Sequence, residues 1–339
     1  MDKEILNELE TEILDILQNE INDIIVETRK NMVVVEEKAD GDSATVADVK
    51  IGEICDTEFP ELLPGSIVIQ EESFNEKVYE QAKTTKYIWV VDPIDGTKAF
   101  RDTSNSEWCV GICLLEDLNP ILSLVYIPEP WLGKPYLISA NKFRDGLWNF
   151  GKPFKAKNNL KNFKYVSHIH RDTERNEVEN KIAELFENNE TIRAYAGHST
   201  LAQFAEVAID TNKVFTRRGA NIWDIIQGAY LIQKNGGEVF YEDGTNVFPL
   251  KPEVLTFKEN HLVMPFTIAC SLDVKEQILN KIKWHKGLDK KSKSFFVVDD
   301  TCKCYNVSNN HCFEVFYELC KNDTFTWNDL WKTYCCEEN

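Results

Sequence analysis

Residues 89–100 read WVVDPIDGTKAF, and this stretch carries the strongest structural signal in the chain. A β-prone run ends in Asp92 and Asp95, with Pro93 stiffening the backbone between them and Gly96 permitting close approach. Two like charges at the end of a buried strand repel each other unless a cation neutralises them. Mg2+ takes carboxylate oxygens as ligands and bridges to substrate phosphate. The stretch therefore suggests a Mg2+ site, beside which Thr97 and the Gly96 and Thr97 amides are placed to bind a phosphate oxygen.

Taken alone, the same stretch is as readily a turn whose acids are solvated, because Asp-Pro and Asp-Gly pairs mark turns. Two other chemistries fail on spacing. A phosphatase with an aspartyl nucleophile needs an Asp two residues before the second Asp, where this chain has Pro93. A calcium-binding EF-hand loop needs Glu at its twelfth position, where this chain has Thr103.

Further acids share the layout of Asp92 and Asp95. Glu71, followed by Glu72, ends the predicted strand IVIQ at 67–70, and Asp48 begins a helix in SATVADVK at 43–50. Asp224 lies directly behind Trp223 at a helix start, where an Asp is more often a cap than a ligand. Four sites with the same layout, at 92–95, 71–72, 48 and 224, favour a common role over four independent caps.

The remainder of the chain divides into three parts. Helical periodicity at 3–29 and 45–59 and a set of strands separated by turns predict an N-terminal α+β subdomain, residues 1–158, containing an antiparallel meander. Strands and helices then alternate, which predicts an α/β subdomain over 159–285. From 286 to 339 charge, Cys and Trp replace the periodicity, which indicates an appended C-terminal segment. The expected strands are 67–70, 87–91, 108–116, 120–129, 135–139, 163–168, 191–195, 213–216, 238–241 and 263–270, and the later helices 174–187, 199–209, 223–237 and 274–284.

Composition narrows the function classes. The chain has 339 residues and a net charge of −18, which argues against binding to nucleic acid or to an anionic membrane surface. No run approaches the ~20 apolar residues of a membrane span, and the N-terminus is acidic, so a cytoplasmic protein is expected. Six of the ten cysteines fall in the last 38 residues without zinc-site spacing, so reduced structural cysteines are expected.

Four motifs together carry a specific resemblance. DPIDGT, EES at a strand end, KADGDSATVAD and WDIIQGAYLIQKNGG resemble, in order, the lithium-sensitive, Mg2+-dependent phosphatase superfamily of inositol monophosphatases, 3'(2'),5'-bisphosphate nucleotidases and related fructose bisphosphatases. The resemblance covers residues 1–285. It implies an α/β fold layered as an α/β/α/β/α sandwich, with the segment after 285 appended.

The resemblance also implies residue roles. Two or three Mg2+ ions would bind the phosphate and lower the pKa of a water that attacks phosphorus, with no covalent intermediate. The implied metal ligands are Glu71, Asp92, the Ile94 carbonyl, Asp95 and Asp224, and the implied catalytic groups are Asp48, Thr97 and Glu71.

Substrate signals favour the nucleotidase branch. Lys98 is typical of that branch and of histidinol-phosphatase-like members, and KYVSHIHRD at 164–172 resembles its strand end, with Ser167 and His170 matching. The lysine that nucleotidases often place after the Gly197–Thr200 loop is missing, with Gln203 near its position. The expected substrate contacts are Gly96, Thr97, Lys98, Ser167, His170, His198, Ser199 and Arg217, with Arg218 beside it.

The expected activity is therefore hydrolysis of a small phosphate ester, 3'-phosphoadenosine 5'-phosphate above all, by a monomer or homodimer. An inositol, other sugar or histidinol monophosphate phosphatase is the alternative. A catalytically silent regulatory protein on the same fold is the alternative outside enzymes; the intact acids argue against it.

Overall fold

The computed structural model describes residues 1–37, 43–129, 134–156, 164–168, 177–186, 199–210, 213–258, 260–271 and 274–282. Residues Met1–Gln277 form one compact unit, and Ile278–Asn339 form a second. Of the second unit only 278–282 are described, and they are helical. The predicted appended segment 286–339 and its cysteines lie outside the described residues, as does the strand expected at 191–195.

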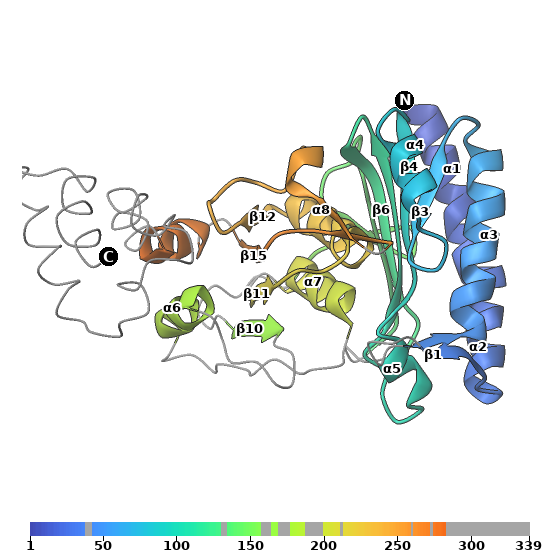
Figure 1. Cartoon of the computed structure of the whole chain (residues 1–339), viewed down its shortest axis with the longest axis horizontal. Coiled ribbons are helices and arrows are strands. Elements are labelled where there is room, and N and C mark those ends of the chain that lie inside the picture. The colour runs from blue at the N-terminus through green and yellow to red at the C-terminus, as the bar shows by residue number, and fades with distance from the viewer. Residues whose placement is uncertain are drawn as a thin grey trace, which may run out of the picture. The chain divides into compact units, whose positions relative to one another are not determined.

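Three helical segments cover one face of the larger sheet (Figure 1). α1 (Lys3–Ile16) continues through a π-helical turn, η1 (Leu17–Ile21), into α2 (Asn22–Lys30). The Asp2 carboxylate caps α1 by accepting from the Ile5 amide at 3.0 Å. α3 (Val46–Leu62) lies beside them, so both predicted N-terminal helices are confirmed.

The larger sheet is the predicted meander with one parallel strand added. Its order is β3-β4-β5-β6-β7-β8-β9; β3 pairs parallel with β4, and every later neighbour is antiparallel. α4 (Glu76–Ala82) connects β3 to β4, and α5 (Thr97–Arg101) follows β4. The strands are β3 (Ile67–Gln70), β4 (Tyr87–Asp95), β5 (Cys109–Glu116), β6 (Asn119–Ile127), β7 (Tyr136–Asn141), β8 (Leu147–Asn149) and β9 (Lys152–Phe154).

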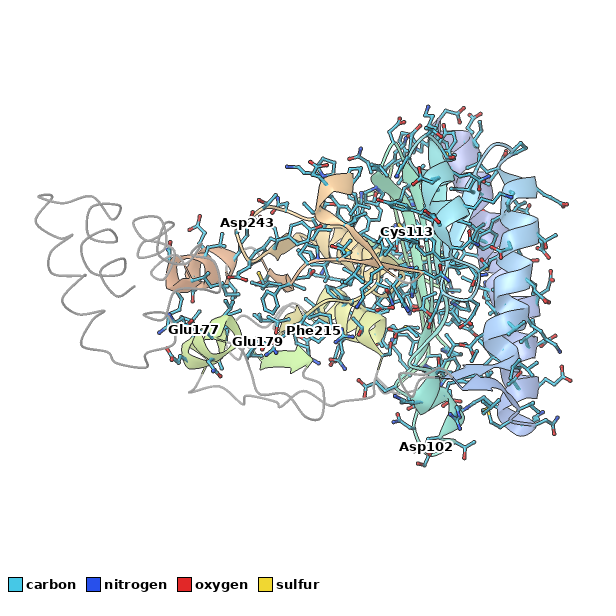
Figure 2. All side chains as sticks on the ribbon, viewed as in Figure 1. Asp102, Cys113, Glu177, Glu179, Phe215 and Asp243 are labelled. Carbon is cyan, nitrogen blue, oxygen red and sulfur yellow. The ribbon has the colours of Figure 1, made fainter. Side chains whose placement is uncertain are left out.

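β5 shows how the sheet divides two hydrophobic cores. Its side chains alternate in direction, as any strand requires. Val110, Ile112 and Leu114 pack towards α1, α2 and α3. Cys109 and Cys113 face the other core, where Figure 2 shows Cys113 among closely packed side chains. The four cysteines of the described residues are all free and buried, as expected of reduced structural cysteines that pack as small hydrophobes.

The second half builds a smaller sheet behind a helical layer. α7 (Thr200–Ile209) and α8 (Ile226–Lys234) contact strands of both sheets, and α6 (Glu177–Leu185) contacts β10 (Figure 1). Helix, sheet, helix, sheet and helix thus follow one another, as the α/β/α/β/α expectation requires. The smaller sheet has the order β10-β11-β15-β12, with β10 (Lys164–His168), β11 (Lys213–Arg217), β12 (Gly237–Tyr241) and β15 (Thr267–Ser271).

The remaining elements of the unit are short strands and 3-10 turns. A hairpin of β1 (Val34–Glu37) and β2 (Ser43–Thr45) precedes α3, and a 3-10 turn, η2 (Ile222–Asp224), precedes α8. The single strand expected over 263–270 is wrong. Pro265 interrupts it and leaves two strands, β14 (His261–Val263) and β15. β14 pairs with β13 (Thr256–Lys258). A further 3-10 turn is η3 (Pro252–Val254).

The predicted division at residue 158 is not where the compact units separate, because both sheets lie within Met1–Gln277. The core that contains Cys113 also contains Phe215 of β11, so one hydrophobic core joins the two halves (Figure 2). The boundaries 1–158 and 159–285 therefore stay a proposal about how the chain is subdivided within this unit. Among the helices of the described residues, none is long and apolar enough to cross a membrane.

Candidate metal centre

The end of β4 positions the two aspartates of the DPIDGT motif. Residues three apart on a regular strand face opposite sides of the sheet. In the pairing with β5, however, Asp92 lies opposite Gly111 and Asp95 opposite Cys109, so three steps on β4 match two on β5. This β-bulge inserts one residue and turns both carboxylates to the same side. The alternative of a turn with solvated acids is therefore wrong, because the strand continues through Asp95 and Asp92 is buried.

Asp224 joins this pair from the other half of the chain. η2 contacts β4, and one carboxylate oxygen from each of Asp92, Asp95 and Asp224 can be chosen so that all three lie within 4.8 Å of one another. The Asn221 amide donates to Asp224 Oδ2 at 3.0 Å and fixes its orientation. Three acids at this separation match the oxygen-rich ligand set of a hard divalent cation.

Glu71 contributes charge to the same cluster. It follows the last residue of β3, where Gln70 pairs with Val91, so the parallel register brings Glu71 beside Asp92. Burial raises the pKa of both Asp92 and Asp224, and the charges of Asp95 and then Glu71 raise it further. The structure thus brings together the four acids that the sequence predicted as metal ligands.

Asp92 provides the test of whether a cation fits. Its side chain is 1% exposed, and neither carboxylate oxygen has a hydrogen-bond partner. Burial, followed by the charges of Asp95, Glu71, Asp224 and Asp48, raises its pKa well above the usual range. A buried carboxylate without partners is costly, and a coordinated cation would remove that cost. The donor set therefore fits a divalent metal.

Asp95 is held by the start of α7. Ser199 Oγ donates to Asp95 Oδ2 at 2.7 Å, and the Leu201 amide donates to the same oxygen. Burial raises the pKa of Asp95 to about 6, while these two hydrogen bonds oppose the rise. Ser199, expected as a substrate contact, thus lies against Asp95, and its contact with substrate stays a prediction. The contribution of the Leu201 amide was missed, since a backbone donor leaves no signal in the sequence.

Asp48 lies at the edge of the cluster in a capping box at the start of α3. Thr45 donates to Asp48 Oδ2 from its amide at 2.7 Å and from its hydroxyl at 2.6 Å. Thr97 Oγ1 has two acceptors for its single proton, Asp48 Oδ1 at 3.3 Å and the Ile94 carbonyl at 3.1 Å. Burial raises the pKa of Asp48 to about 6. Thr45 was missed, although its spacing of three residues from Asp48 is that of a capping box.

Of the expected substrate contacts, Gly96, Ser199 and Arg217 lie near Asp95. The charge of Arg217 acts on Asp95 and Asp224, and Arg218 pairs with Glu179 of α6. Lys98 instead lines a pocket with Arg101. Ser167 lies on β10, but its side chain is outside the described residues, as are His170 and His198.

Comparison with known proteins identifies the family. The model of the inositol monophosphatase family matches residues 5–272, more than half of the chain. The chain belongs to the inositol monophosphatase family. This membership confirms the superfamily that the four motifs indicated, and together with the fold it supports a metal-dependent phosphatase.

Several curated relatives carry the name 3'(2'),5'-bisphosphate nucleotidase CysQ, and two of them illustrate the match. The protein from Escherichia coli (strain K12) is 27% identical over 236 residues, which cover 69% of this chain and 88% of that protein. The protein from Buchnera aphidicola is also 27% identical, over 191 residues. That match covers 53% of this chain and 64% of the Buchnera protein, slightly less than two thirds of its length.

A solved structure of the same family confirms the fold. An IMPase/NADP phosphatase complexed with Mg2+ and phosphate superposes with a TM-score of 0.62 at 18% identity, covering 82% of this chain and 96% of that chain. The layered sandwich expected from the motifs is therefore the fold of the present chain.

Proposed function

We propose that this protein is a Mg2+-dependent phosphomonoesterase that hydrolyses 3'-phosphoadenosine 5'-phosphate to AMP and phosphate. One observation carries the metal-dependent part: both oxygens of buried Asp92 lack partners while Asp95 and Asp224 stand within 4.8 Å. An arrangement of this kind is destabilising for a protein that makes no use of a cation, which argues against a silent regulatory protein.

The roles follow from the position of each group. Asp92, Asp95, Asp224, Glu71 and the Ile94 carbonyl would hold two or three Mg2+ ions, which neutralise phosphate charge and acidify a water when bound. Asp48 has a pKa of about 6, so near neutral pH it is predominantly ionised and can accept a proton. Thr97 bridges Asp48 and the Ile94 carbonyl, and so orients the group that holds the attacking water.

Two observations support a bisphosphate nucleotide as substrate. Both CysQ relatives are named for that activity, at 27% identity. Lys98, typical of the same branch, follows Thr97 directly and is exposed. Gln203, near the position of the missing nucleotidase lysine, donates to Glu107 rather than standing open to substrate. Since no lysine occupies this position, a cationic side chain elsewhere is needed to bind the second phosphate.

The substrate assignment predicts a kinetic preference. A hydrogen bond to a charged group contributes ~1.5–3 kcal/mol, so 3'-phosphoadenosine 5'-phosphate should exceed inositol 1-phosphate by about tenfold to a hundredfold in kcat/KM. Steady-state kinetics on both substrates at equal Mg2+ and pH measure this ratio. If inositol 1-phosphate is preferred tenfold, the chain is an inositol monophosphatase and the nucleotidase assignment is wrong.

Inhibition by lithium, a cytoplasmic location, and a monomeric or homodimeric state remain predictions of the same proposal.

A further inference from the structure

Arg29, in the last turn of α2, is bound to an acid from a distant part of the chain. Its Nε donates to Glu129 Oε1 at 2.9 Å and its Nη2 donates to Glu129 Oε2 at 2.8 Å, which is a bidentate pair. Glu129 lies just past the end of β6, and the two side chains are 11% and 30% exposed. The pair fixes the plane of the guanidinium and leaves three of its five N–H groups for other acceptors.

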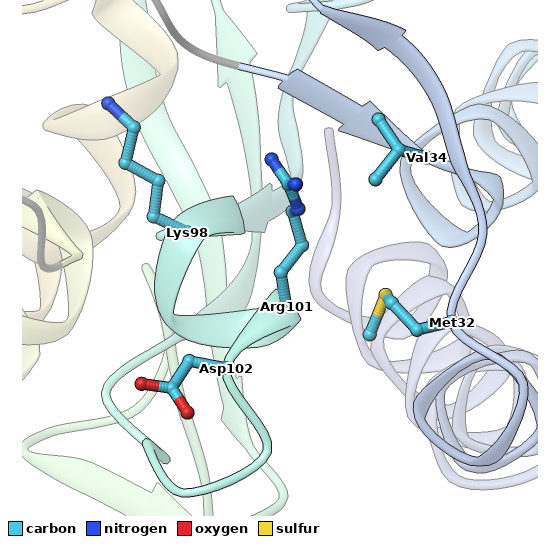
Figure 3. Close-up of a pocket in the computed structure, with 5 residues that line it drawn as sticks. All are labelled: Met32, Val34, Lys98, Arg101 and Asp102. Atoms are coloured by element: carbon cyan, nitrogen blue, oxygen red, sulfur yellow. The ribbon is translucent and has the colours of Figure 1, made fainter.

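The three remaining N–H groups donate to backbone carbonyls around the end of α5. Nη1 donates to the Phe100 carbonyl and, at 3.2 Å, to the Asp102 carbonyl. Nη2 donates to the Asn105 carbonyl at 3.1 Å. Figure 3 shows this end of α5, with Asp102 just past it. The last carbonyls of a helix have no donor within the helix, so the guanidinium of Arg29 supplies what α5 cannot.

Two buried aromatic rings lie against the same guanidinium. Phe100 of α5 and Trp108, which directly precedes β5, are both 0% exposed, and their rings meet edge to face at 4.8 Å. Arg29 Cζ lies 5.6 Å from the centroid of the Phe100 ring and 5.8 Å from that of Trp108, which is within the range of cation–π attraction. Arg29 therefore holds both ends of the segment 100–108, where α5 ends and where β5 begins.

α5 is short enough to transmit a shift at its end to the candidate catalytic groups. Its five residues begin at Thr97, and the Phe100 amide donates to the Gly96 carbonyl at 2.9 Å. Thr97 Oγ1 lies 3.3 Å from Asp48 Oδ1 and 3.1 Å from the Ile94 carbonyl. A displacement of Phe100 therefore changes the position of the Thr97 hydroxyl relative to Asp48.

We propose that Arg29 is a positioning residue for the reaction, because its hold on Glu129 and on the end of α5 keeps Thr97 against Asp48. The inference rests on the proposed phosphomonoesterase function but not on which ester is hydrolysed. Two acids of the metal centre are oriented by other groups: Asp95 by Ser199 and the Leu201 amide, and Asp224 by the Asn221 amide. Loss of Arg29 should therefore impair turnover and spare the binding of Mg2+.

The experiment replaces Arg29 with lysine in the full chain. Lysine keeps the charge, but its three donors cannot make a bidentate pair and three carbonyl contacts together. On whichever of 3'-phosphoadenosine 5'-phosphate and inositol 1-phosphate the wild-type chain hydrolyses faster, kcat should fall about tenfold, since a misplacement of about 1 Å can cost about a hundredfold. KM should change little, and the rise in Tm on adding Mg2+ should persist.

A second measurement reports on α5 without activity. The amides of Phe100 and Asp102 close α5 by donating to the Gly96 and Lys98 carbonyls. In Arg29→Lys their hydrogen exchange should become faster by about tenfold or more, because hydrogen bonds from a charged group that oppose local opening are lost.

Arg144→Lys is the matched control. Arg144 also pairs with a buried acid, Glu10, and its Cζ lies 4.3 Å from the centroid of the Trp148 ring. It follows β7 at the end of the sheet where β4 begins, whereas α5 follows the other end of β4. This variant should lower the Tm, as Arg29→Lys does, and leave both kcat and the exchange of α5 unchanged.

Glu129→Gln tests the same contact if Arg29→Lys fails to fold, since Glu129 is the more exposed partner. It should lower kcat and speed the exchange of α5 by smaller factors, and its effects should not add to those of Arg29→Lys. An unchanged kcat, a fall in kcat without faster exchange, or an equal fall in Arg144→Lys overturns the inference while the phosphomonoesterase proposal stands. If the wild-type chain hydrolyses neither ester with Mg2+, the proposed function is overturned, and the inference with it.

Discussion

Replacing Asp92 with asparagine is expected to reduce kcat by more than about a hundredfold, since losing even an outer-shell partner of a metal ligand costs about 10–100-fold. The substitution keeps the shape of the side chain and removes its charge. Because Asp92 is 1% exposed with no partner for either oxygen, the charge stabilises the folded protein only through a bound cation.

The same variant should uncouple stability from Mg2+. A ligand that binds the folded state alone stabilises it in proportion to RT ln(1 + [L]/Kd), so the Tm of the wild-type chain should rise with Mg2+. The Tm of Asp92→Asn should rise much less. Asp117→Asn is the control, because Asp117 is exposed and has a φ of 49°, a conformation that asparagine tolerates. Near-normal turnover of Asp92→Asn at saturating Mg2+ would show that the metal centre lies elsewhere.

Gly96→Ala should be strongly damaging although Gly96 carries no side-chain chemistry. Gly96 has a φ of +90°, and a Cβ there would stand 2.9 Å from the Glu107 carbonyl oxygen and 3.0 Å from Ser199 Cβ. Left-handed strain costs about 1–2 kcal/mol and overpacking about 1–3 kcal/mol, so unfolding in urea should show a loss of more than about 2 kcal/mol. Relief of the clash must shift residue 96, Glu107 or Ser199, and Ser199 donates to Asp95. A displacement of about 1 Å in the site can reduce turnover by about a hundredfold.

Gly65→Ala separates the backbone strain from the steric clash. Gly65 has a φ of +87°, nearly that of Gly96, but no atom lies within 4 Å of its added Cβ. This control should lose only the strain of about 1–2 kcal/mol and keep full turnover. Equal losses in the two variants would mean that the close approach of Gly96 to Glu107 and Ser199 has no consequence.

The order of elements could be predicted because it depends on local patterns. Periodicity over 3–29 predicted α1 and α2, although the π-helical turn between them has no clear sequence signal. The acids at strand ends predicted a metal centre, and the structure brings Asp92, Asp95 and Asp224 together. What local pattern could not predict was the bulge in β4, because it depends on the register against β5.

Contacts between segments distant in the chain could not be predicted from the sequence either. The position of Lys98 was interpreted together with Arg217, but the orientation of α5 and the hairpin beside it place Lys98 with Arg101, Met32 and Val34. Ser199 was expected at the substrate, and its hydrogen bond to Asp95, set by the approach of α7 to β4, could not be predicted. In both cases the residue type was informative, and its partner was fixed by tertiary packing.

The most direct measurement of the central claim is phosphate release from 3'-phosphoadenosine 5'-phosphate by the full chain, stripped with EDTA and then titrated with Mg2+. The account predicts no turnover in the stripped protein and a saturable rise with Mg2+ that Asp92→Asn lacks. Turnover that is undiminished without a divalent cation would contradict it.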